Sequence, residues 1–430
     1  MTGSDPVRTP RTRNTSENSS RQCFSDSGSV VLINITGPDR KGLDACFACI
    51  LAQYDVRILD IGQSVIHEHI SLGILAAIPC KKDFSAIFKD MLFEGYKLGL
   101  NVDIKPVDPD SYENWVRAQG KERRIITILG QAISARQIGA VASVCAQHGM
   151  NIDYITRLTG RISLQHPKSQ SRPRASIQFS VSGTPKCMKS MRGQFMDISR
   201  ETGVDISFHV DNIYQKNRKL VVFDMDSTLI QSEVIVELSK MAGAGPQVEQ
   251  ITRSAMQGEM DFKESFTKRV ALLKGLTQSD LDRIIQTLPL TEGAELVTAT
   301  LKRLGYKLGI LSGGFTFVGE YLKEKLGFDY VYANELDMEN GIVTGRVRGE
   351  IVDGEKKASL LREIAQRENL SIQQTIAVGD GANDLPMISI AGLGVAFNAK
   401  PVVRKEAASA ISTTGLDGLL YLMGIHEREI

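Results

Sequence analysis

The 430-residue sequence lacks any apolar run approaching the roughly 20 residues that a membrane-spanning helix requires. It also lacks an excess of either charge, because 51 basic and 50 acidic residues leave a formal net charge of +1. Such a balance gives no electrostatic reason to bind nucleic acid or anionic membranes. Cysteine is absent after Cys187, and His426 is the only histidine in the last 220 residues. The second half of the chain therefore offers no cysteine nucleophile, and a lone histidine near the chain end is typical of a solvated residue.

The remaining composition, 42% hydrophobic and 23% charged, is typical of an ordinary soluble globular protein. The length predicts two or three domains. Residues 1–28 are rich in Ser, Thr, Arg and Asn and lack the apolar core of a secretory signal, so we expect a disordered tail there. The cysteines show no paired metal-ligand spacing. We therefore expect a cytoplasmic protein with no nucleic-acid or membrane partner.

Two carboxylates follow an apolar run at residues 220–223. The next five residues are Asp224-Met225-Asp226-Ser227-Thr228. Because side chains two apart on an extended segment point the same way, Asp224 and Asp226 would project together from the end of a buried strand. One could attack a phosphorus atom while the other manages the proton of the leaving group. The spacing alone is weak, since Asp-x-Asp is common in solvated turns and helix caps.

Two further apolar segments are each followed by polar residues that also suit phosphoryl transfer. The segment 307–311 leads into Ser312-Gly313-Gly314, and 375–378 leads into Gly379-Asp380-Gly381-Ala382-Asn383-Asp384. Lys357 lies between them in the sequence. Open parallel sheets bind ligands at the carboxyl ends of their strands. The three strand ends together therefore predict a site for phosphoryl transfer.

These motifs resemble the haloacid-dehalogenase superfamily of aspartate-nucleophile phosphotransferases, and within it the phosphoserine phosphatase family. The likeness covers about Leu220 to the C-terminus. It implies an α/β domain at 218–430, a Rossmann-like parallel sheet with a helical cap at about 231–291. It also implies that Asp224 is the nucleophile and forms an aspartyl-phosphate, with Asp226 as general acid and then general base.

A divalent cation is expected because two carboxylates facing a phosphate dianion would repel it. Mg²⁺ fits, since it takes hard oxygen ligands from carboxylates and substrate phosphate. The resemblance implies that Asp224, Asp380 and the backbone carbonyl of Asp226 are the protein ligands. Asp384 is expected to orient metal-bound water or Lys357.

The charge of the transferring phosphoryl group also needs preorganised donors. Lys357 would supply a point charge and Ser312 a hydroxyl. Gly313 would leave its N–H open to close approach. A lysine beside Lys356 at a helix start is ordinarily solvated. The position of Lys357 between the second and last motifs is what favours the phosphate role.

Substrate recognition is expected from the cap. Phosphoserine carries an ammonium and a carboxylate, so its pocket needs an acid and an arginine. The resemblance assigns these roles to Glu233 and Arg269, with Met256 and Phe262 as apolar walls and Asn383 as a further contact. Spacing alone favours plainer roles: a helix-dipole contact for Glu233, a solvated face for Arg269 and ordinary core for the walls.

A tight β-hairpin is predicted at Asn340-Gly341, which separates the apolar segments 335–338 and 342–345. It would form a small ribbon beside the active site. We assign it no catalytic role.

The first half of the chain contains an internal repeat. Two βαββαβ patterns, at 29–108 and 123–212, predict two α+β ferredoxin-like domains. The loop Gly37–Gly42 resembles the ligand loop of ACT domains, which often bind amino acids between paired copies. The corresponding loop Gly130–Ser134 lacks the pair Asp39-Arg40. We expect serine to act at the first copy and the chain to form a homodimer, although a purely structural role for both copies stays open.

The resemblance implies hydrolysis of O-phospho-L-serine to L-serine and phosphate in serine biosynthesis. Two alternatives remain open. One is a relative that acts on another small phosphate ester or passes phosphate to an alcohol such as homoserine, because water and alcohol acceptors use the same aspartyl-phosphate. The other is an amino-acid sensor whose catalytic domain is vestigial.

Overall fold

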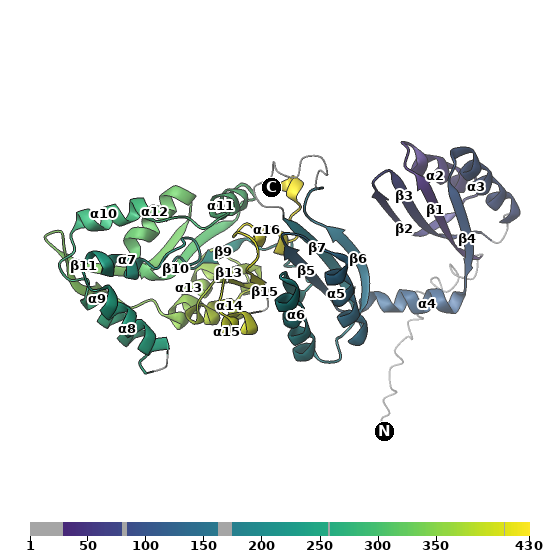
Figure 1. Ribbon diagram of the computed structural model, residues 1–430. Coiled ribbons are helices and arrows are strands. Elements are labelled where there is room, and N and C mark those ends of the chain that lie inside the picture. The colour runs from purple at the N-terminus through teal and green to yellow at the C-terminus, as the bar shows by residue number, and fades with distance from the viewer. Residues whose placement is uncertain (1–28, 80–83, 162–173, 257–258, 408) are drawn as a thin grey trace, which may run out of the picture. The chain divides into compact units, whose positions relative to one another are not determined.

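The computed structural model describes residues 29–79, 84–161, 174–256, 259–407 and 409–430. The expected tail at 1–28 and most of the connection between the two middle strands of the second repeat lie outside these ranges. The chain divides into two compact units, Met1–Gly120 and Lys121–Ile430, which we describe separately (Figure 1). Within the described ranges, every helix is too short or too polar to cross a membrane.

The first unit contains one βαββαβ domain, as the sequence predicts. Its strands form an antiparallel sheet in the order β2-β3-β1-β4. Alternate residues of β1, such as Val31, Ile33 and Ile35, are buried in the core with Phe47 of α2 and Ile87 of α3. The elements are β1 (Val30–Pro38), α2 (Leu43–Gln53), β2 (Arg57–Ile66), β3 (His69–Ala77), α3 (Phe84–Leu98) and β4 (Asn101–Val107).

The first unit ends in a helix that the sequence analysis did not predict, α4 (Pro109–Arg117), followed by the short 3₁₀ helix η1 (Ala118–Gly120). Asp108 caps α4 by accepting a hydrogen bond of 2.9 Å from the backbone N–H of Ser111. Pro109 follows at the first helical position, where its fixed φ is favourable. This Asp-Pro start signal was present in the sequence.

The second unit begins with the second βαββαβ domain. Its sheet has the order β6-β7-β5-β8, which matches that of the first domain and confirms the repeat. Its core contains Ile126, Ile128 and Phe179. The elements are β5 (Arg123–Gly130), α5 (Ala135–Gln147), β6 (Asn151–Arg157), β7 (Ala175–Ser182), α6 (Met188–Thr202) and β8 (Asp205–Val210).

The rest of the second unit is built on a seven-stranded sheet in the order β12-β11-β10-β9-β13-β14-β15. All neighbours in it are parallel except β11 and β12, which form the predicted Asn340-Gly341 hairpin. The strands are β9 (Leu220–Phe223), β10 (Lys307–Phe315), β11 (Tyr330–Glu339), β12 (Ile342–Arg348), β13 (Thr375–Gly379), β14 (Leu393–Phe397) and β15 (Ser409–Ile411).

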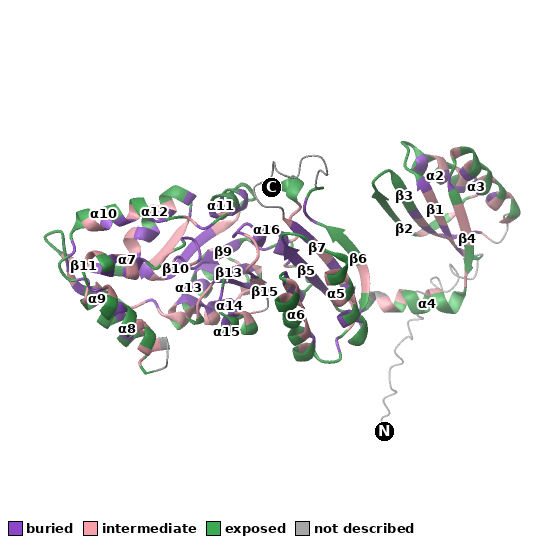
Figure 2. Cartoon of the chain, viewed as in Figure 1, coloured by how far each residue is buried: buried purple, intermediate pink, exposed green. Residues whose placement is uncertain are grey.

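The central strand β9 is buried on both faces (Figure 2). Val221 and Phe223 pack on one side with α11 and α12, while Leu220 and Val222 pack on the other with α13 and α14. A short apolar run with both faces covered is typical of a parallel sheet. The covering helices and short helices are α11 (Ala294–Arg303), α12 (Thr316–Leu326), α13 (Gly354–Arg367), α14 (Leu385–Ile390), α15 (Pro401–Glu406), α16 (Gly418–Leu422), η2 (Ile372–Gln374), η3 (Ala382–Asp384) and η4 (Glu427–Glu429).

A helical cap is inserted between β9 and α11. The two linkers that join it to the sheet run side by side: Gln231 N donates to Pro289 O and Thr291 N to Leu229 O, each at 2.9 Å. The β11–β12 hairpin contacts the cap, where Gly275 N donates to Val343 O at 3.0 Å. The cap helices are α7 (Val234–Met241), α8 (Gly245–Met256), α9 (Phe262–Ala271) and α10 (Gln278–Thr287).

The second βαββαβ domain shares a core with the sheet domain. Leu129 and Leu158 belong to the same apolar cluster as Val221 of β9. Asp205, 1% exposed, accepts four hydrogen bonds of 2.6–2.8 Å from the backbone and hydroxyl groups of Ser412 and Thr413. The domain is therefore a fixed part of the second unit.

Candidate active site

The carboxyl ends of β9, β10 and β13 meet at one edge of the sheet, because β9 pairs with both other strands. Asp224 follows β9, and its backbone N–H donates to Val378 O of β13 at 2.8 Å. Ser312 lies within β10, and Asp380 follows β13. Chain order reverses around β9, which is where open α/β sheets bind their ligands.

Lys357 lies fully buried between two carboxylates. Its Nζ donates to Asp224 Oδ1 at 2.8 Å and to Asp384 Oδ1 at 2.6 Å. Burial opposes the charged form, but the two carboxylates outweigh it and hold the pKa of Lys357 above its ordinary value. The lysine therefore stays a cation and fixes the orientation of the Asp224 carboxylate.

Helix α13 delivers this lysine. Asp353 caps the helix by accepting a 2.9 Å hydrogen bond from Lys356 N, and Asp353 O accepts another of 2.9 Å from Lys357 N. Asp353 also pairs with Lys263 of cap helix α9 at 3.0 Å, which joins the cap to the start of α13. Asp353 is not among the residues predicted from the sequence, although an aspartate just before a helix is a common cap signal.

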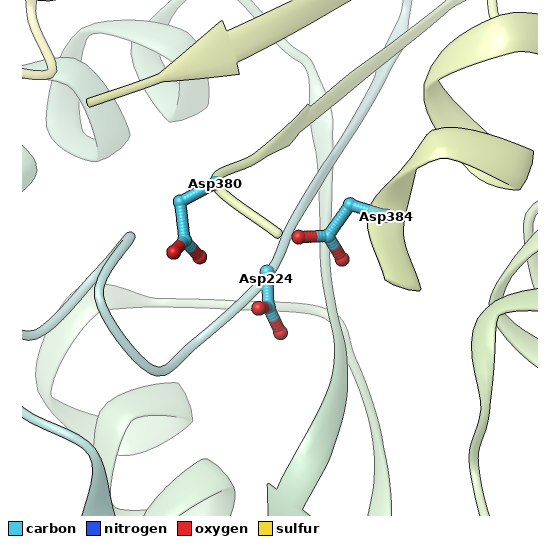
Figure 3. A group of neighbouring side chains, drawn as sticks. All are labelled: Asp224, Asp380 and Asp384. Atoms are coloured by element: carbon cyan, nitrogen blue, oxygen red, sulfur yellow. The ribbon is translucent and has the colours of Figure 1, made fainter. Parts of the chain in front are cut away.

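Three acidic side chains, those of Asp224, Asp380 and Asp384, converge at this edge of the sheet (Figure 3). Carboxylate oxygens of Asp224, Asp380 and Asp384 all lie within 4.8 Å of one another. Burial, the neighbouring Asp224 and other acids raise the pKa of Asp380 to about 8, and burial followed by the charge of Asp224 raises that of Asp384 to about 6. Such crowding of hard oxygen donors fits a divalent cation of the Mg²⁺ class.

Asp226 lies half-buried at the amino end of α7. Its carboxyl group accepts a hydrogen bond from the backbone N–H of Val234. Burial, then the charges of Glu233 and Asp224, raise its pKa well above the ordinary value. Within the described part of the chain, no group hydrogen-bonds to its buried Oδ1. Asp226 is therefore suited to hold a proton and to exchange it with a ligand.

The loop Ser312–Gly314 lies next to both acids of β9. Gly314 N donates to Ser312 Oγ at 3.0 Å. A methyl group at Gly314 would lie 3.2 Å from Asp226 Oδ2 and from Ser312 Oγ, and closer still to Met225. Glycine is needed here because this backbone approaches the carboxylate so closely.

The cap brings Glu233 and Arg269 toward Asp226. Ser227, whose φ of 59° is unusual for serine, donates from Oγ to Glu233 Oε1 at 2.9 Å. Burial lowers the pKa of Arg269, while the nearby carboxylates of Glu233 and Asp226 act to raise it. An acid and an arginine of the cap thus face the general-acid candidate. Ser227 is not among the residues predicted from the sequence, and its strained backbone conformation is typical of functional sites.

The remaining predicted contacts fall into three cases. Phe262 stacks on Phe266 with ring centroids 5.9 Å apart, and its Cζ would lie 3.0 Å from a methyl group at Gly313, so it covers the glycine loop. Asn383 is half-buried beside Asp384, with its side-chain oxygen against Gly381. Met256 ends α8, and its side chain lies outside the described residues.

Family comparisons agree with this architecture. Residues 221–389 match the haloacid dehalogenase-like hydrolase family, and residues 29–105 and 123–209 each match an ACT domain family. The fold and the site therefore define a haloacid dehalogenase-like hydrolase that carries two ACT domains.

Full-length relatives refine this class. The chain is 40% identical to the phosphoserine phosphatase of Streptomyces coelicolor, covering 93% of both chains. It is 38% identical to phosphoserine phosphatase SerB2 of Mycobacterium tuberculosis, covering 93% of this chain and 94% of the relative. A solved structure described as a probable phosphoserine phosphatase from Vibrio cholerae superposes with a TM-score of 0.54 at 32% identity, covering 70% of this chain and 86% of that one. The chain belongs to the phosphoserine phosphatase family.

Proposed function

We propose that this chain hydrolyses O-phospho-L-serine to L-serine and phosphate through an aspartyl-phosphate on Asp224. One observation carries the proposal: Asp224 is held by Lys357 beside a protonatable Asp226, under a cap that presents Glu233 and Arg269. Relatives of nearly equal length bear the name of this activity. The serine that this reaction releases would be the product of serine biosynthesis.

In the first step, an oxygen of Asp224 attacks the phosphorus atom and the bond to the serine oxygen breaks. Asp226, whose raised pKa keeps a proton available, donates that proton to the leaving serine oxygen. The products of this step are serine and the phosphorylated Asp224. Lys357 and the Ser312 hydroxyl stabilise the charge on the phosphoryl oxygens.

In the second step, the ionised Asp226 takes a proton from a water molecule that attacks the phosphorus atom. The bond between phosphorus and the Asp224 oxygen then breaks, and Asp224 regains its carboxylate. Phosphate leaves and Asp226 is protonated again.

Asp224, Asp380 and the backbone carbonyl of Asp226 would hold Mg²⁺, with Asp384 turned toward Lys357. When bound, the ion neutralises the repulsion between these acids and the phosphate oxygens. The donor set supports this assignment, because three carboxylates lie together while the lysine pairs with only two of them, Asp224 and Asp384.

Glu233 would bind the ammonium group of the substrate and Arg269 its carboxylate. Replacing Arg269 with lysine keeps the charge but removes the planar fork. We expect the KM for phosphoserine to rise about tenfold or more, as one bidentate contact is lost. Hydrolysis of phenyl phosphate, which has no carboxylate, should be unchanged. An equal loss of activity on phosphoserine and on phenyl phosphate would contradict the assignment of Arg269 to the substrate carboxylate.

The test of the activity is phosphate release from phosphoserine with Mg²⁺ by the wild type and by Asp224→Asn. The variant should lose activity by at least about 10³-fold because an amide cannot act as the nucleophile. Asp282→Asn, an exposed cap residue, serves as the matched control and should retain full activity. Turnover by Asp224→Asn at the wild-type rate would overturn the mechanism.

The first ACT domain is the proposed site of serine feedback. Its loop exposes Asp39 and Arg40 on the surface, just before α2. Inhibition by serine should be lost in Asp39→Ala and retained in Asp55→Ala; unaltered inhibition in Asp39→Ala would remove this site. A homodimer formed through ACT domains and a cytoplasmic location complete the proposal.

A further inference from the structure

The pairing of strands β10 and β11 shifts register at the loop Ser312–Gly314. Leu311 pairs with Tyr332, but the next pair is Phe315 with Asn334. Four steps along β10 therefore correspond to two along β11. The residues pushed out of the ladder are those of the loop Ser312–Gly314, whose backbone needs partners other than the neighbouring strand.

The side chain of Asn334 supplies these partners. Its Nδ2 donates to Gly313 O at 2.8 Å, and its Oδ1 accepts from Val352 N at 2.8 Å. The residue is 2% exposed. Because a carbonyl oxygen can only accept and a backbone N–H can only donate, the orientation of the carboxamide is fixed by its two partners.

The first hydrogen bond sets the direction of a peptide group. Gly313 C=O and Gly314 N–H belong to one planar peptide unit and point in opposite directions. Holding the carbonyl toward Asn334 therefore directs the N–H away from it, onto Ser312 Oγ at 3.0 Å. With its oxygen accepting this bond, the Ser312 hydroxyl can donate its proton to a phosphate oxygen.

The second hydrogen bond reaches the lysine helix. Val352 directly precedes Asp353, the cap residue of α13, and Lys357 N donates to Asp353 O at 2.9 Å. Lys357 Nζ in turn holds Asp224. The buried carboxamide of Asn334 thus links the loop Ser312–Gly314 to the start of α13, the helix that carries Lys357.

We propose that Asn334 is a positioning residue for phosphoryl transfer. It contacts no substrate itself. It sets the spacing between the Ser312 hydroxyl and Lys357 and fixes the orientation of the peptide between them. The inference rests on the proposed function, which assigns these two groups to the phosphoryl oxygens. Asn334 should matter more for stabilising the transition state than for binding the substrate. The reason is that misplaced hydrogen-bond donors no longer stabilise the charge that develops on the phosphoryl oxygens in the transition state.

Two variants separate the roles of the carboxamide. Asn334→Asp keeps the shape and the acceptor for Val352 N but removes the donor to Gly313 O. Asn334→Leu, of similar volume, removes both. Asn340→Asp, in the exposed hairpin turn, is the matched control for the added charge. Each full-length protein is assayed with Mg²⁺ for kcat and KM on phosphoserine, for inhibition by orthovanadate and phosphate, and for its melting temperature.

We expect kcat of Asn334→Asp to fall about 10- to 100-fold, with KM changed less than about threefold. Inhibition by vanadate, which resembles the transition state, should weaken in parallel with kcat, while inhibition by phosphate changes less. Asn334→Leu should lose at least as much activity, and Asn340→Asp should match the wild type. A lowered melting temperature with unchanged kcat and vanadate inhibition would overturn the proposal, because Asn334 would then be structural only.

The same experiment distinguishes this inference from the proposed function. If the wild type fails to hydrolyse phosphoserine, that function is wrong, and calorimetric binding of vanadate and phosphate still tests Asn334. Vanadate binding that is equal in wild type and Asn334→Asp, or absent from both, would reject the role of Asn334.

Discussion

At the scale of single residues, Lys357 has the largest electrostatic role in the site. It is the shared counter-charge of Asp224 and Asp384, and all three groups are buried. Lys357→Met would leave two carboxylates facing each other without a cation. We expect the free energy of unfolding, measured by urea without metal, to fall by about 3–5 kcal/mol, as for other broken buried pairs. Activity should be lost as well.

The neighbouring residue provides the control for this change. Lys356 pairs with Glu350 at the surface, at 2.6 Å. Lys356→Met should leave both the unfolding curve and the activity unchanged, because exposed pairs contribute little. If Lys357→Met and Lys356→Met have equal free energies of unfolding, the buried contacts of Lys357 with Asp224 and Asp384 do not stabilise the fold.

Residues of the site differ in how far the sequence could reveal them. Asp224, Ser312 and Asp380 each follow an apolar segment of the sequence closely, so the apolar pattern and the chemistry of these residues identify them together. Asn334 carries no such signal, because its partners Gly313 and Val352 lie 21 and 18 residues away in the chain. The register shift between β10 and β11, which is a property of the folded sheet, leaves the Gly313 carbonyl for the Asn334 side chain.

At the scale of elements, periodicity predicted both βαββαβ repeats and the three strands of the site. The helix α4 was missed although its Asp108-Pro109 start signal stands in the sequence, and none of its residues is buried in a core. The cap was predicted as helical between about 231 and 291, and its helices span Val234–Thr287. Its contact with the β11–β12 hairpin was not predicted, since it depends on how the two elements pack.

Two glycines of the hairpin region test that contact. Gly345 and Gly349 both have φ of 83°, so alanine at either is strained. A methyl group at Gly345 would lie 3.0 Å from Ala271 O and 3.2 Å from Lys274 Cβ in the cap, whereas at Gly349 it meets no described atom within 4 Å. Gly349→Ala should lower the free energy of unfolding by about 1–2 kcal/mol. Gly345→Ala should cost more and also raise KM, because it displaces the cap.

Denaturant unfolding and phosphoserine kinetics on both variants measure this difference. Equal stability and equal KM would mean that the hairpin does not position the cap.

At the scale of the whole molecule, the two ACT domains differ in what they contact within their own units. The second one is joined to the sheet domain through Asp205, whose partners Ser412 and Thr413 are 207 and 208 residues away. Ser207 Oγ adds a hydrogen bond of 2.6 Å to Ser409 Oγ. The sequence predicted two copies that differ in their ligand loops, but it did not predict this junction, since no local pattern records such distant contacts.

This junction should make the second unit sensitive to acid. His209 on β8 is buried near Arg218, and its Nδ1 lies 3.3 Å from Ser207 Oγ. Burial, and then the charge of Arg218, lower the pKa of His209 to about 3. In the unfolded chain its pKa returns to about 6.5, so the unfolded state binds the proton first as the pH falls. Stability contributed by neutral His209 is therefore complete above about pH 6.5 and declines between about pH 6.5 and 3.

The slope of this decline is about 1.4 kcal/mol per pH unit for one group, so acidification from pH 6.5 to 5 should cost about 2 kcal/mol. His209→Gln, which cannot take up a proton, should show a smaller loss of unfolding free energy over this interval than the wild type. His69→Gln changes an exposed histidine of the other unit and should leave the wild-type dependence intact. Denaturant unfolding at pH 7.5, 6 and 5 compares the three proteins. If the unfolding free energy of His209→Gln declines as steeply as that of the wild type, protonation of His209 is not what destabilises the second unit.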